Sequence, residues 1–519
     1  MKLWKRILSC FLALLLTVYL LPVQVMAEEL GDLWPLTTEN IAETPPDVIG
    51  EVLERREENQ KEFLLANGVR QVVIYPAAVH YQKDGQWKDI DNRLLPATTR
   101  DGETVYQNVA GMWDVSVPAE LNTARGITVS RNGYSLSFYL TGQLFEDGGA
   151  ISESGSASMG EELPGEDMIC VPAGESTAAI SSTTSTLADD DQLQPEAALK
   201  NQRSKALYQN VYHDTDVTYD LDSNRLKESL ILRSYPKEML GYRYRLETDS
   251  LRLELQEDNR ILAYAKDAGP QDEPVFYMPA PYLLDAENAY SNDIKVTLEE
   301  NDKGYELRYY LPQDWMATAA YPVILDPVVQ PVSNTFTIRD KTVTQRNPPA
   351  YDDISLDAGY STNRGRERIY IRFKNIPSLT SADVVVGAKV LLCKYSGSGS
   401  ISGNYMTAHQ VKSMWDSETI TWANRADYVH TSEDYQFVAG QTWHSWDITN
   451  IAQKWYEPSG NTGVMLRMSE AVEGGTTTKT ASFYSSDYSN TQQCPMLVIS
   501  YINNLSLIHI SEPTRHAQI

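Results

Sequence analysis

The chain has 519 residues and carries a formal net charge of −26 at pH 7. Without the two ends described below, this length allows two or three domains that each have a core of their own. A strongly acidic chain repels phosphate backbones, so we do not expect nucleic acid to be a partner.

The first residues have the layout of a secretory signal peptide. Lys2, Lys5 and Arg6 precede an apolar run at 7–21, and small or apolar residues lead up to Ala27. The run is too short to span a bilayer comfortably. We expect residues 1–27 to be a cleaved signal peptide, which predicts a secreted or wall-associated protein without membrane insertion after cleavage.

The last residues do not resemble natural protein sequence. The stretch LSLIHISEPTR at 505–515 resembles the translation of a sequencing adapter. We therefore set residues 505–519 aside as an artefact, with a genuine polar tail as the alternative. On this interpretation the chain is a fragment, and the natural protein continues past residue 501.

One helix is predicted near the start of the mature chain, in the N-terminal segment 28–68. Thr44 can cap it, Pro45 suits its first turn, and Asn67-Gly68 can end it. Val48, Val52 and Leu53 lie at helical spacing, and the charged run at 54–58 predicts a solvated face.

After Val69 the apolar residues alternate with polar ones, which predicts antiparallel strands with one buried face. Hairpin turns are predicted at Asp84-Gly85, Asn132-Gly133 and Asp258-Asn259, and the strands around 294–298 and 305–311 are expected to pair. The fold class is therefore mainly β, with two antiparallel β-sandwich or jelly-roll-like modules.

Two breaks in this pattern organise the chain. Residues 146–205 are rich in Ser, Thr, Gly and acids and nearly lack aromatics, so we predict a disordered insertion there. A strand at 323–325 ends at Asp326-Pro327, which predicts a boundary between one module at 69–327 and a second at 332–501.

The first module carries several motifs in order: AVHY at 78–81, DGQWKDIDN at 84–92, YQNVY at 208–212, NRLKE at 224–228 and YPVILDP at 321–327. Together they resemble the N-terminal region of large secreted or wall-associated surface proteins of Gram-positive bacteria. That resemblance implies RHS (YD) repeats, and in some relatives a toxin, further along the chain.

The second module has a sharper pattern. Its motifs are DKTV at 340–343, NP at 347–348, LDAG at 356–359, NRGRERIYIRF at 363–373, WDSETITW at 415–422, WDITN at 446–450, QKW at 453–455, FYSSD at 483–487 and PMLVI at 495–499. Their order resembles the DNRLRE domain, akin to family 96 carbohydrate-binding modules. The resemblance implies a jelly-roll β-sandwich and a polysaccharide or cell-wall glycan as partner.

Candidate ligand contacts follow from the chemistry of sugar binding, which needs exposed rings. Trp443, Tyr484 and Tyr488 are in loop-like contexts and are the candidates. Trp415 and Trp422 are interpreted as core and turn residues, and the alternating arginines of 366–372 as partners of nearby acids.

A structural calcium ion is the one cofactor considered. Asp340, Asp352 and Asp357 offer hard oxygen ligands of the kind that calcium prefers. The run at 220–224 imitates the start of an EF-hand loop but has Arg225 where the glycine is required, so we interpret it as a hairpin turn.

Cysteine use is sparse and supports neither zinc nor a disulfide framework. Cys170, Cys393 and Cys494 remain outside the signal peptide, without CxxC spacing. Cys393 has a strand-like context and is expected to be a small buried hydrophobe; a bridge to Cys494 is the alternative.

No catalytic motif stands out, so we expect the chain not to be an enzyme. The histidines outside the tail are His80, His213, His409, His430 and His444, and none has a metalloprotease spacing. Three hypotheses remain: a glycan-binding surface protein, the delivery half of an RHS-type toxin, or the non-catalytic part of a polysaccharide-degrading enzyme.

Overall fold

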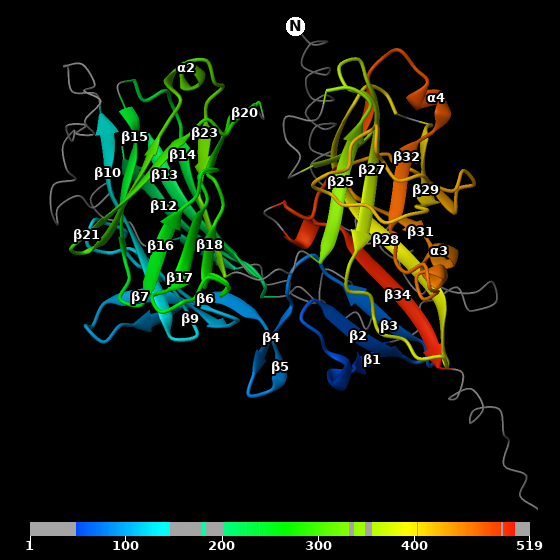
Figure 1. Cartoon of the computed structure of the whole chain (residues 1–519), viewed down its shortest axis with the longest axis horizontal. Coiled ribbons are helices and arrows are strands. Elements are labelled where there is room, and N and C mark those ends of the chain that lie inside the picture. The colour runs from blue at the N-terminus through cyan, green and yellow to red at the C-terminus, as the bar shows by residue number, and fades with distance from the viewer. Residues whose placement is uncertain are drawn as a thin grey trace, which may run out of the picture.

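The computed structural model describes residues 48–145, 179–182, 201–331, 337–347 and 355–503, apart from residues 213, 224, 238, 288, 402, 489 and 490. Two β-rich bodies lie side by side, with a short hairpin near the junction (Figure 1). The described strands pair antiparallel, so the predicted mainly β class is confirmed.

The first β-body is built from two sheets. One is eight-stranded, in the order β21-β22-β15-β10-β9-β8-β7-β6. Its strands are β6 (Asp91–Thr98), β7 (Thr104–Ala110), β8 (Asp114–Pro118), β9 (Ile127–Arg131), β10 (Tyr134–Phe145), β15 (Met239–Glu247), β21 (Lys295–Asn301) and β22 (Gly304–Tyr310).

The other sheet of this body is eleven-stranded and is centred on β12, β13 and β14. Its strands are β11 (Ala179–Ser182), β12 (Ser204–Tyr212), β13 (Thr215–Asp222), β14 (Arg225–Leu232), β16 (Leu251–Leu255), β17 (Ile261–Ala265), β18 (Phe276–Met278), β19 (Tyr282–Leu284), β20 (Tyr290–Ser291), β23 (Val323–Asp326) and β24 (Val328–Pro331). One apolar core joins the two sheets: Trp113 beside β8 contacts Phe276 of β18, with ring centroids 6.3 Å apart.

The second β-body contains a thirteen-stranded arrangement. Its strands are β1 (Val48–Glu51), β2 (Gln60–Leu65), β3 (Arg70–Ile74), β25 (Ile338–Thr344), β26 (Ser355–Ser361), β27 (Gly365–Phe373), β28 (Asp383–Ser398), β29 (Tyr405–Gln410), β30 (Asp434–Phe437), β31 (Trp443–Asp447), β32 (Val464–Met468), β33 (Lys479–Tyr484) and β34 (Met496–Asn503). The long strand β28 links its layers, since it pairs with β34 and β31 over most of its length and with β33 at its end.

The N-terminal strands belong to this second body, although the predicted module boundary placed residues from 69 onward in the first. Strand β3 pairs with β34, and β2 and β1 extend the sheet (Figure 1). Val72 and Ile74 point into the main core of the second body, while Val73 faces a smaller cluster with Leu391 and Val498. Both faces of β3 are therefore buried.

The predicted N-terminal helix is wrong. The described part of that segment forms β1, a single 3-10 turn at Leu53–Arg55 and β2. Leu53 is 60% exposed, so the helical spacing does not produce a buried face, whereas β2 buries Phe63 and Leu65 between two partner strands. Strand pairing with distant residues outweighs the local preference for a helix.

The predicted hairpins are confirmed where they fall on described residues. Asn132 and Gly133 both have positive φ, as a tight turn between twisted strands requires, and they join β9 to β10. Strand β21 pairs with β22, as expected. The EF-hand mimic is a hairpin turn in which Asp222 of β13 pairs with Arg225 of β14.

The predicted disordered insertion at 146–205 lies mostly outside the described residues. Within it, β11 pairs with β12, and β12 begins at Ser204, earlier than the predicted restart at Tyr208. The signal peptide, Cys170 and the adapter-like tail also lie outside the described residues.

Helices are short throughout the described ranges. They are α2 (Gln313–Met316), α3 (Thr449–Lys454), α4 (Glu470–Glu473) and the 3-10 turns η3 (Leu53–Arg55) and η5 (Thr491–Gln493). In the part of the chain that the structure describes, none of them has the length and apolar character needed to cross a membrane.

Side chains near η5 join the two bodies. Arg225 at the start of β14 donates hydrogen bonds to the backbone carbonyls of Asp487 and Tyr488, and the Thr491 hydroxyl donates to Asp222 at 2.9 Å. The β4–β5 hairpin (His80–Lys83 and Gln86–Asp89) leads the chain from the second body into the first.

Candidate functional site

Two of the predicted sugar-contacting rings stack on each other. The ring centroids of Tyr484 and Tyr488 are 3.9 Å apart, and Tyr395 stacks on Tyr484 at 4.6 Å. All three rings are half-buried. Because each ring face inside this stack is covered by a neighbour, only the outer faces remain for a ligand.

The third predicted ring is half-buried, with one side in contact with an apolar cluster. Trp443 begins β31, where it pairs with Cys393 of β28, and it packs against the small core cluster that contains Tyr75 and Leu391. Cys393 is buried, as expected, and both Cys393 and Cys494 are thiols in the structure, so the alternative bridge is not formed.

The predicted structural roles hold for Trp415 and for Arg368, which pairs with Glu473, whereas Arg366 donates to a backbone carbonyl and Arg372 to the Met414 sulfur. Trp415 is buried, and its indole nitrogen donates to the carbonyl of Thr462 at 3.0 Å. Trp422 lies half-buried between the guanidinium groups of Arg368 and Arg425.

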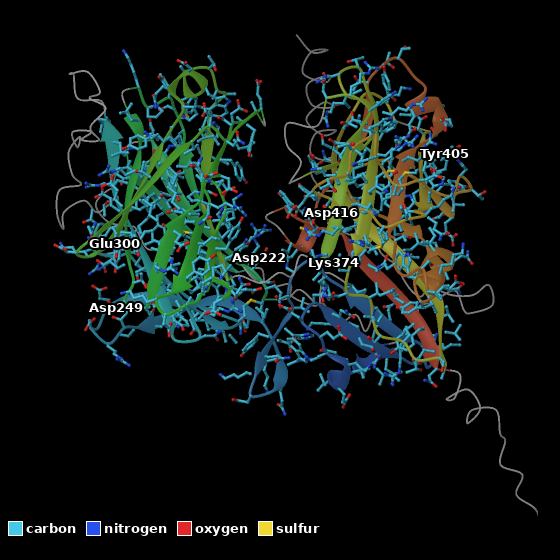
Figure 2. The ribbon with its side chains drawn as sticks, viewed as in Figure 1. Asp222, Asp249, Glu300, Lys374, Tyr405 and Asp416 are labelled. Atoms are coloured by element: carbon cyan, nitrogen blue, oxygen red, sulfur yellow. The ribbon has the colours of Figure 1, made fainter. Side chains whose placement is uncertain are left out.

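An exposed aromatic cluster lies elsewhere, on the outer strands β29 and β30. Tyr405, Tyr435 and Phe437 are 40%, 56% and 56% exposed. Tyr405 is the register partner of Phe437, and the three ring centroids lie 5.6–6.2 Å apart in edge-to-face arrangements. Tyr405 is at the outer side of the second body (Figure 2).

Sequence reasoning missed this aromatic cluster, although a signal was present. Met406 and Ala408 of β29 are buried core residues, so period-two alternation turns Tyr405 outward. Tyr435 and Phe437 are two residues apart and therefore share one face of β30. Three outward rings on paired strands then form one surface.

A polar depression on another part of the second body is lined by two arginines and two aspartates, Arg372, Arg425, Asp416 and Asp427. Its lining also includes Trp415, and the Arg372 guanidinium lies over the Trp415 ring at 5.9 Å. Burial, together with the nearby Arg339, lowers the pKa of both Arg372 and Lys374. The charge of Asp416 acts on the pKa of Lys374 in the opposite direction and favours the charged form of the lysine; both residues are labelled in Figure 2.

The acids predicted to hold calcium have other partners. Asp340 accepts hydrogen bonds from the backbone nitrogen and the hydroxyl of Ser486, at 2.8 and 2.9 Å, and burial raises its pKa to about 6. Asp357 forms an ion pair with Arg364 at 3.0 Å. Asp352 lies outside the described residues, so a calcium site remains a prediction.

Comparison with known families finds a match for the C-terminal part of the second body. Residues 329–501 match carbohydrate-binding module family 96, which agrees with the module predicted at 332–501. This region contains the exposed aromatic cluster, the tyrosine stack and the polar depression.

The chain as a whole is similar to much longer bacterial proteins. It is 22% identical over 503 residues to tRNA nuclease WapA of Bacillus subtilis (strain 168), and 22% identical over 507 residues to tRNA3(Ser)-specific nuclease WapA of Bacillus spizizenii. Each similarity covers 89% of this chain but only 19% of the relative.

Proposed function

We propose that residues 329–501 bind a polysaccharide or cell-wall glycan through the exposed aromatic cluster. The supporting observation is that Tyr405, Tyr435 and Phe437 leave ring surface open to solvent within the region that matches a carbohydrate-binding family. Aromatic faces offer large, rigid apolar surface, and tyrosine adds a hydroxyl that can remain hydrated or bind a sugar oxygen.

The angles between the rings indicate the kind of contact. The three pairs are inclined by 66°, 79° and 85°, so the rings do not form one flat platform. Such rings can enclose one or two sugar units from different sides. We therefore expect the aromatic cluster to prefer a chain end or a bent segment over a long flat stretch.

A glycan array probed with the labelled full chain tests the proposal, followed by calorimetric titration of the retained glycans. Replacing Tyr405, Tyr435 or Phe437 with alanine is expected to weaken binding by about tenfold or more, since central aromatic contacts carry much of a binding free energy. Tyr235→Ala is the matched control, because Tyr235 is a 39% exposed ring outside residues 329–501.

The outcomes separate the alternatives. If no glycan is retained, or if all three alanine variants bind as the parent does, the aromatic cluster is not the binding site. Loss of binding in Arg372→Ala alone would place the ligand in the polar depression instead.

Calcium is tested in the same assay. We propose that Asp340, Asp352 and Asp357 supply oxygen ligands, so chelation with EDTA is expected to lower glycan retention and Asp357→Asn to make retention insensitive to EDTA. Equal retention with and without EDTA would contradict the calcium proposal and leave the glycan proposal intact.

We propose that the chain is non-catalytic and acts outside the cell or at the wall. The secretory signal predicted at 1–27 supports the location. Incubating retained glycans with the protein is expected to release no reducing sugar, and antibodies are expected to find the protein in the wall or medium fraction. Release of sugar, or a cytoplasmic location, would contradict this.

A second candidate is the N-terminal delivery or scaffold part of an RHS-type toxin. Its support is the similarity to the WapA nucleases, of which this chain spans only 19%. Sequencing the gene beyond residue 501 decides between the candidates: YD repeats support this one, whereas a hydrolase domain supports the polysaccharide-degrading alternative.

A further inference from the structure

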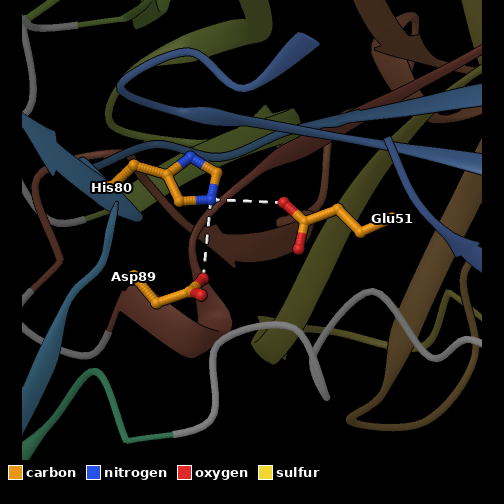
Figure 3. A group of neighbouring side chains, drawn as sticks. All are labelled: Glu51, His80 and Asp89. Carbon is orange, nitrogen blue, oxygen red and sulfur yellow. Dashed lines mark ion pairs between the residues drawn. The ribbon is translucent and has the colours of Figure 1, made fainter. Parts of the chain in front are cut away.

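Three side chains from separate strands converge beside the β4–β5 hairpin. Glu51 lies on β1, His80 on β4 and Asp89 on β5, and one potential ligand atom of each lies within 4.8 Å of the others (Figure 3). We call them the Glu51–His80–Asp89 cluster. In the described ranges, no other group of three or more His, Cys, Asp or Glu meets this criterion.

The histidine has a defined orientation and protonation pattern. His80 is 0% exposed, and its Nδ1 lies 2.6 Å from the backbone carbonyl of Glu57. A carbonyl oxygen only accepts hydrogen bonds, so Nδ1 carries the proton and the lone pair of the neutral ring is on Nε2. Among the described residues, Nε2 has no hydrogen-bond partner.

Nε2 faces two carboxylates, with which a protonated ring forms ion pairs (Figure 3). Nε2 lies 3.4 Å from Oε1 of Glu51 and 3.5 Å from Oδ1 of Asp89. Both distances exceed the 2.7–3.2 Å range of ordinary N–H···O hydrogen bonds. A tetrahedral Zn²⁺ with ligand bonds of about 2.0–2.2 Å separates its nitrogen and oxygen ligands by about 3.4 Å. The spacing therefore suits a metal ion better than a shared proton.

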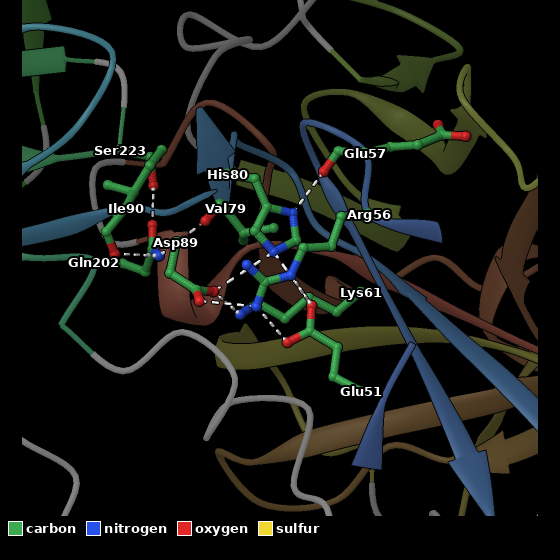
Figure 4. Close-up of polar contacts among 10 residues, drawn as sticks. All are labelled: Glu51, Arg56, Glu57, Lys61, Val79, His80, Asp89, Ile90, Gln202 and Ser223. Atoms are coloured by element: carbon green, nitrogen blue, oxygen red, sulfur yellow. Dashed lines mark hydrogen bonds and ion pairs between the residues drawn. The ribbon is translucent and has the colours of Figure 1, made fainter. Parts of the chain in front are cut away.

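Hydrogen bonds and ion pairs from neighbouring groups orient the three proposed ligand side chains, as the partners of metal ligands commonly do. The backbone carbonyl of Glu57 orients the imidazole, and Arg56 forms ion pairs with Glu51 at 2.6 Å and with Asp89 at 2.8 Å (Figure 4). Asp89 is half-exposed, which opens a path for an ion from solvent.

Two neighbouring cations compete with a metal. Arg56 Nε lies 2.6 Å from Oε1 of Glu51, the oxygen that faces His80. The Lys61 ammonium lies 2.5 Å from Oδ1 of Asp89, the same oxygen that faces His80. A bound divalent ion would share or displace these contacts, because two positive charges at such distances repel each other. Removing the lysine charge should therefore strengthen metal binding.

From this geometry we propose that Glu51, His80 and Asp89 bind one divalent transition-metal ion of the zinc class, with the fourth position open to water. The ion would tie β1 of the second β-body to both strands of the β4–β5 hairpin. This proposal is independent of the glycan-binding function, which uses residues 329–501.

Calorimetric titration of the EDTA-treated, untagged full chain with ZnCl₂ tests the proposal, with Co²⁺ absorption as a probe of coordination. We expect one equivalent of Zn²⁺ to bind and Co²⁺ to give the intense visible bands of a tetrahedral site. His80→Ala and Asp89→Asn are expected to weaken binding by about 100-fold or more. His430→Ala, an exposed histidine in the second body, is the matched control and should bind normally.

Lys61→Met provides the sharpest result. It should tighten Zn²⁺ binding by a factor on the order of ten, since a competing charge in contact with a ligand is removed. Absence of a zinc equivalent in the parent, or unchanged binding in both His80→Ala and Asp89→Asn, overturns the proposal. If His80→Ala fails to fold by circular dichroism, the half-exposed Asp89 variant decides.

Discussion

At the scale of single residues, an ionisable group inside the first β-body links stability to pH. Glu228 lines a cavity of about 40 Å³ and accepts hydrogen bonds from the hydroxyls of Tyr219 and Tyr244, at 2.5 and 2.9 Å. Burial raises the pKa of this carboxyl from 4.5 to about 7, although the two hydroxyl contacts favour the charged form. The folded state therefore retains a proton that the unfolded chain releases.

This raised pKa predicts a loss of stability with rising pH. The contribution of Glu228 is fully present below about pH 4.5 and is lost as pH rises through 7, by up to about 3 kcal/mol. Urea unfolding at pH 4.5 and 8 should show this decline, and Glu228→Gln, which imitates the neutral acid, should reduce it. An identical pH profile in the glutamine variant would contradict the assignment.

At the scale of elements, α4 is attached to β27 and β32 through buried charges. Arg368 of β27 makes two hydrogen bonds to the Glu473 carboxylate, at 3.0 and 2.7 Å, and Arg467 of β32 contacts the same group at 2.7 Å. The side chains of Arg368 and Glu473 are 4% and 0% exposed. The sequence predicted that the alternating arginines of 366–372 pair with nearby acids, and this is confirmed for Arg368 alone of the three.

Removing Arg368 should therefore destabilise the second β-body. Arg368→Met is expected to lower the free energy of unfolding by roughly 3–5 kcal/mol, because it leaves buried charge on Glu473 only partly compensated. Arg366→Met is the control on the same strand, since Arg366 is half-buried and donates only to a backbone carbonyl. Similar denaturant midpoints for the two variants would show that the buried pair contributes little.

The N-terminal segment illustrates why element prediction fails locally. Its spacing and charge run suit a helix, yet residues 60–65 form a strand because β3 offers hydrogen bonds and a buried face. The hairpins at Asn132-Gly133 and between β21 and β22 were predicted correctly because their turns and partners are adjacent in sequence.

At the scale of the whole molecule, the second β-body is discontinuous in sequence. Strands β1–β3 come from residues 48–74, and the chain returns to the same sheet only at β25–β34, after the entire first body. Strand β3 covers one edge of β34, and Tyr75 and Val79 cover an apolar cluster that includes Met496 and Val498.

A fragment consisting of residues 332–503 should therefore be less stable than the full chain. Loss of several buried apolar side chains, each contributing about 1.5–3 kcal/mol, should lower its melting temperature by on the order of 10 °C and expose surface that binds ANS. Adding residues 48–90 through a linker should restore the melting temperature. A fragment that melts with the full chain and binds no dye would contradict this.

The candidate sites were predicted only in part. The sequence located the region that matches family 96, but its three candidate rings, Trp443, Tyr484 and Tyr488, are half-buried, whereas Tyr405, Tyr435 and Phe437 of the same region are exposed. Exposure depends on which neighbours cover a ring, and no local pattern encodes that fully. The Glu51–His80–Asp89 cluster had no motif, because its members meet only after β1 and the β4–β5 hairpin are placed.

Alternating side chains determined by themselves that this protein is mainly β, since period two is a property of adjacent residues. The order of the motifs along the chain also predicted the extent of the region that matches family 96. Only the tertiary structure decided that residues 48–74 complete the distant sheet, which rings remain exposed and which ligand atoms converge. The completed sheet, the exposed rings and the converging ligand atoms all depend on contacts between residues far apart in the chain. Such contacts are known only once the strands are packed in three dimensions.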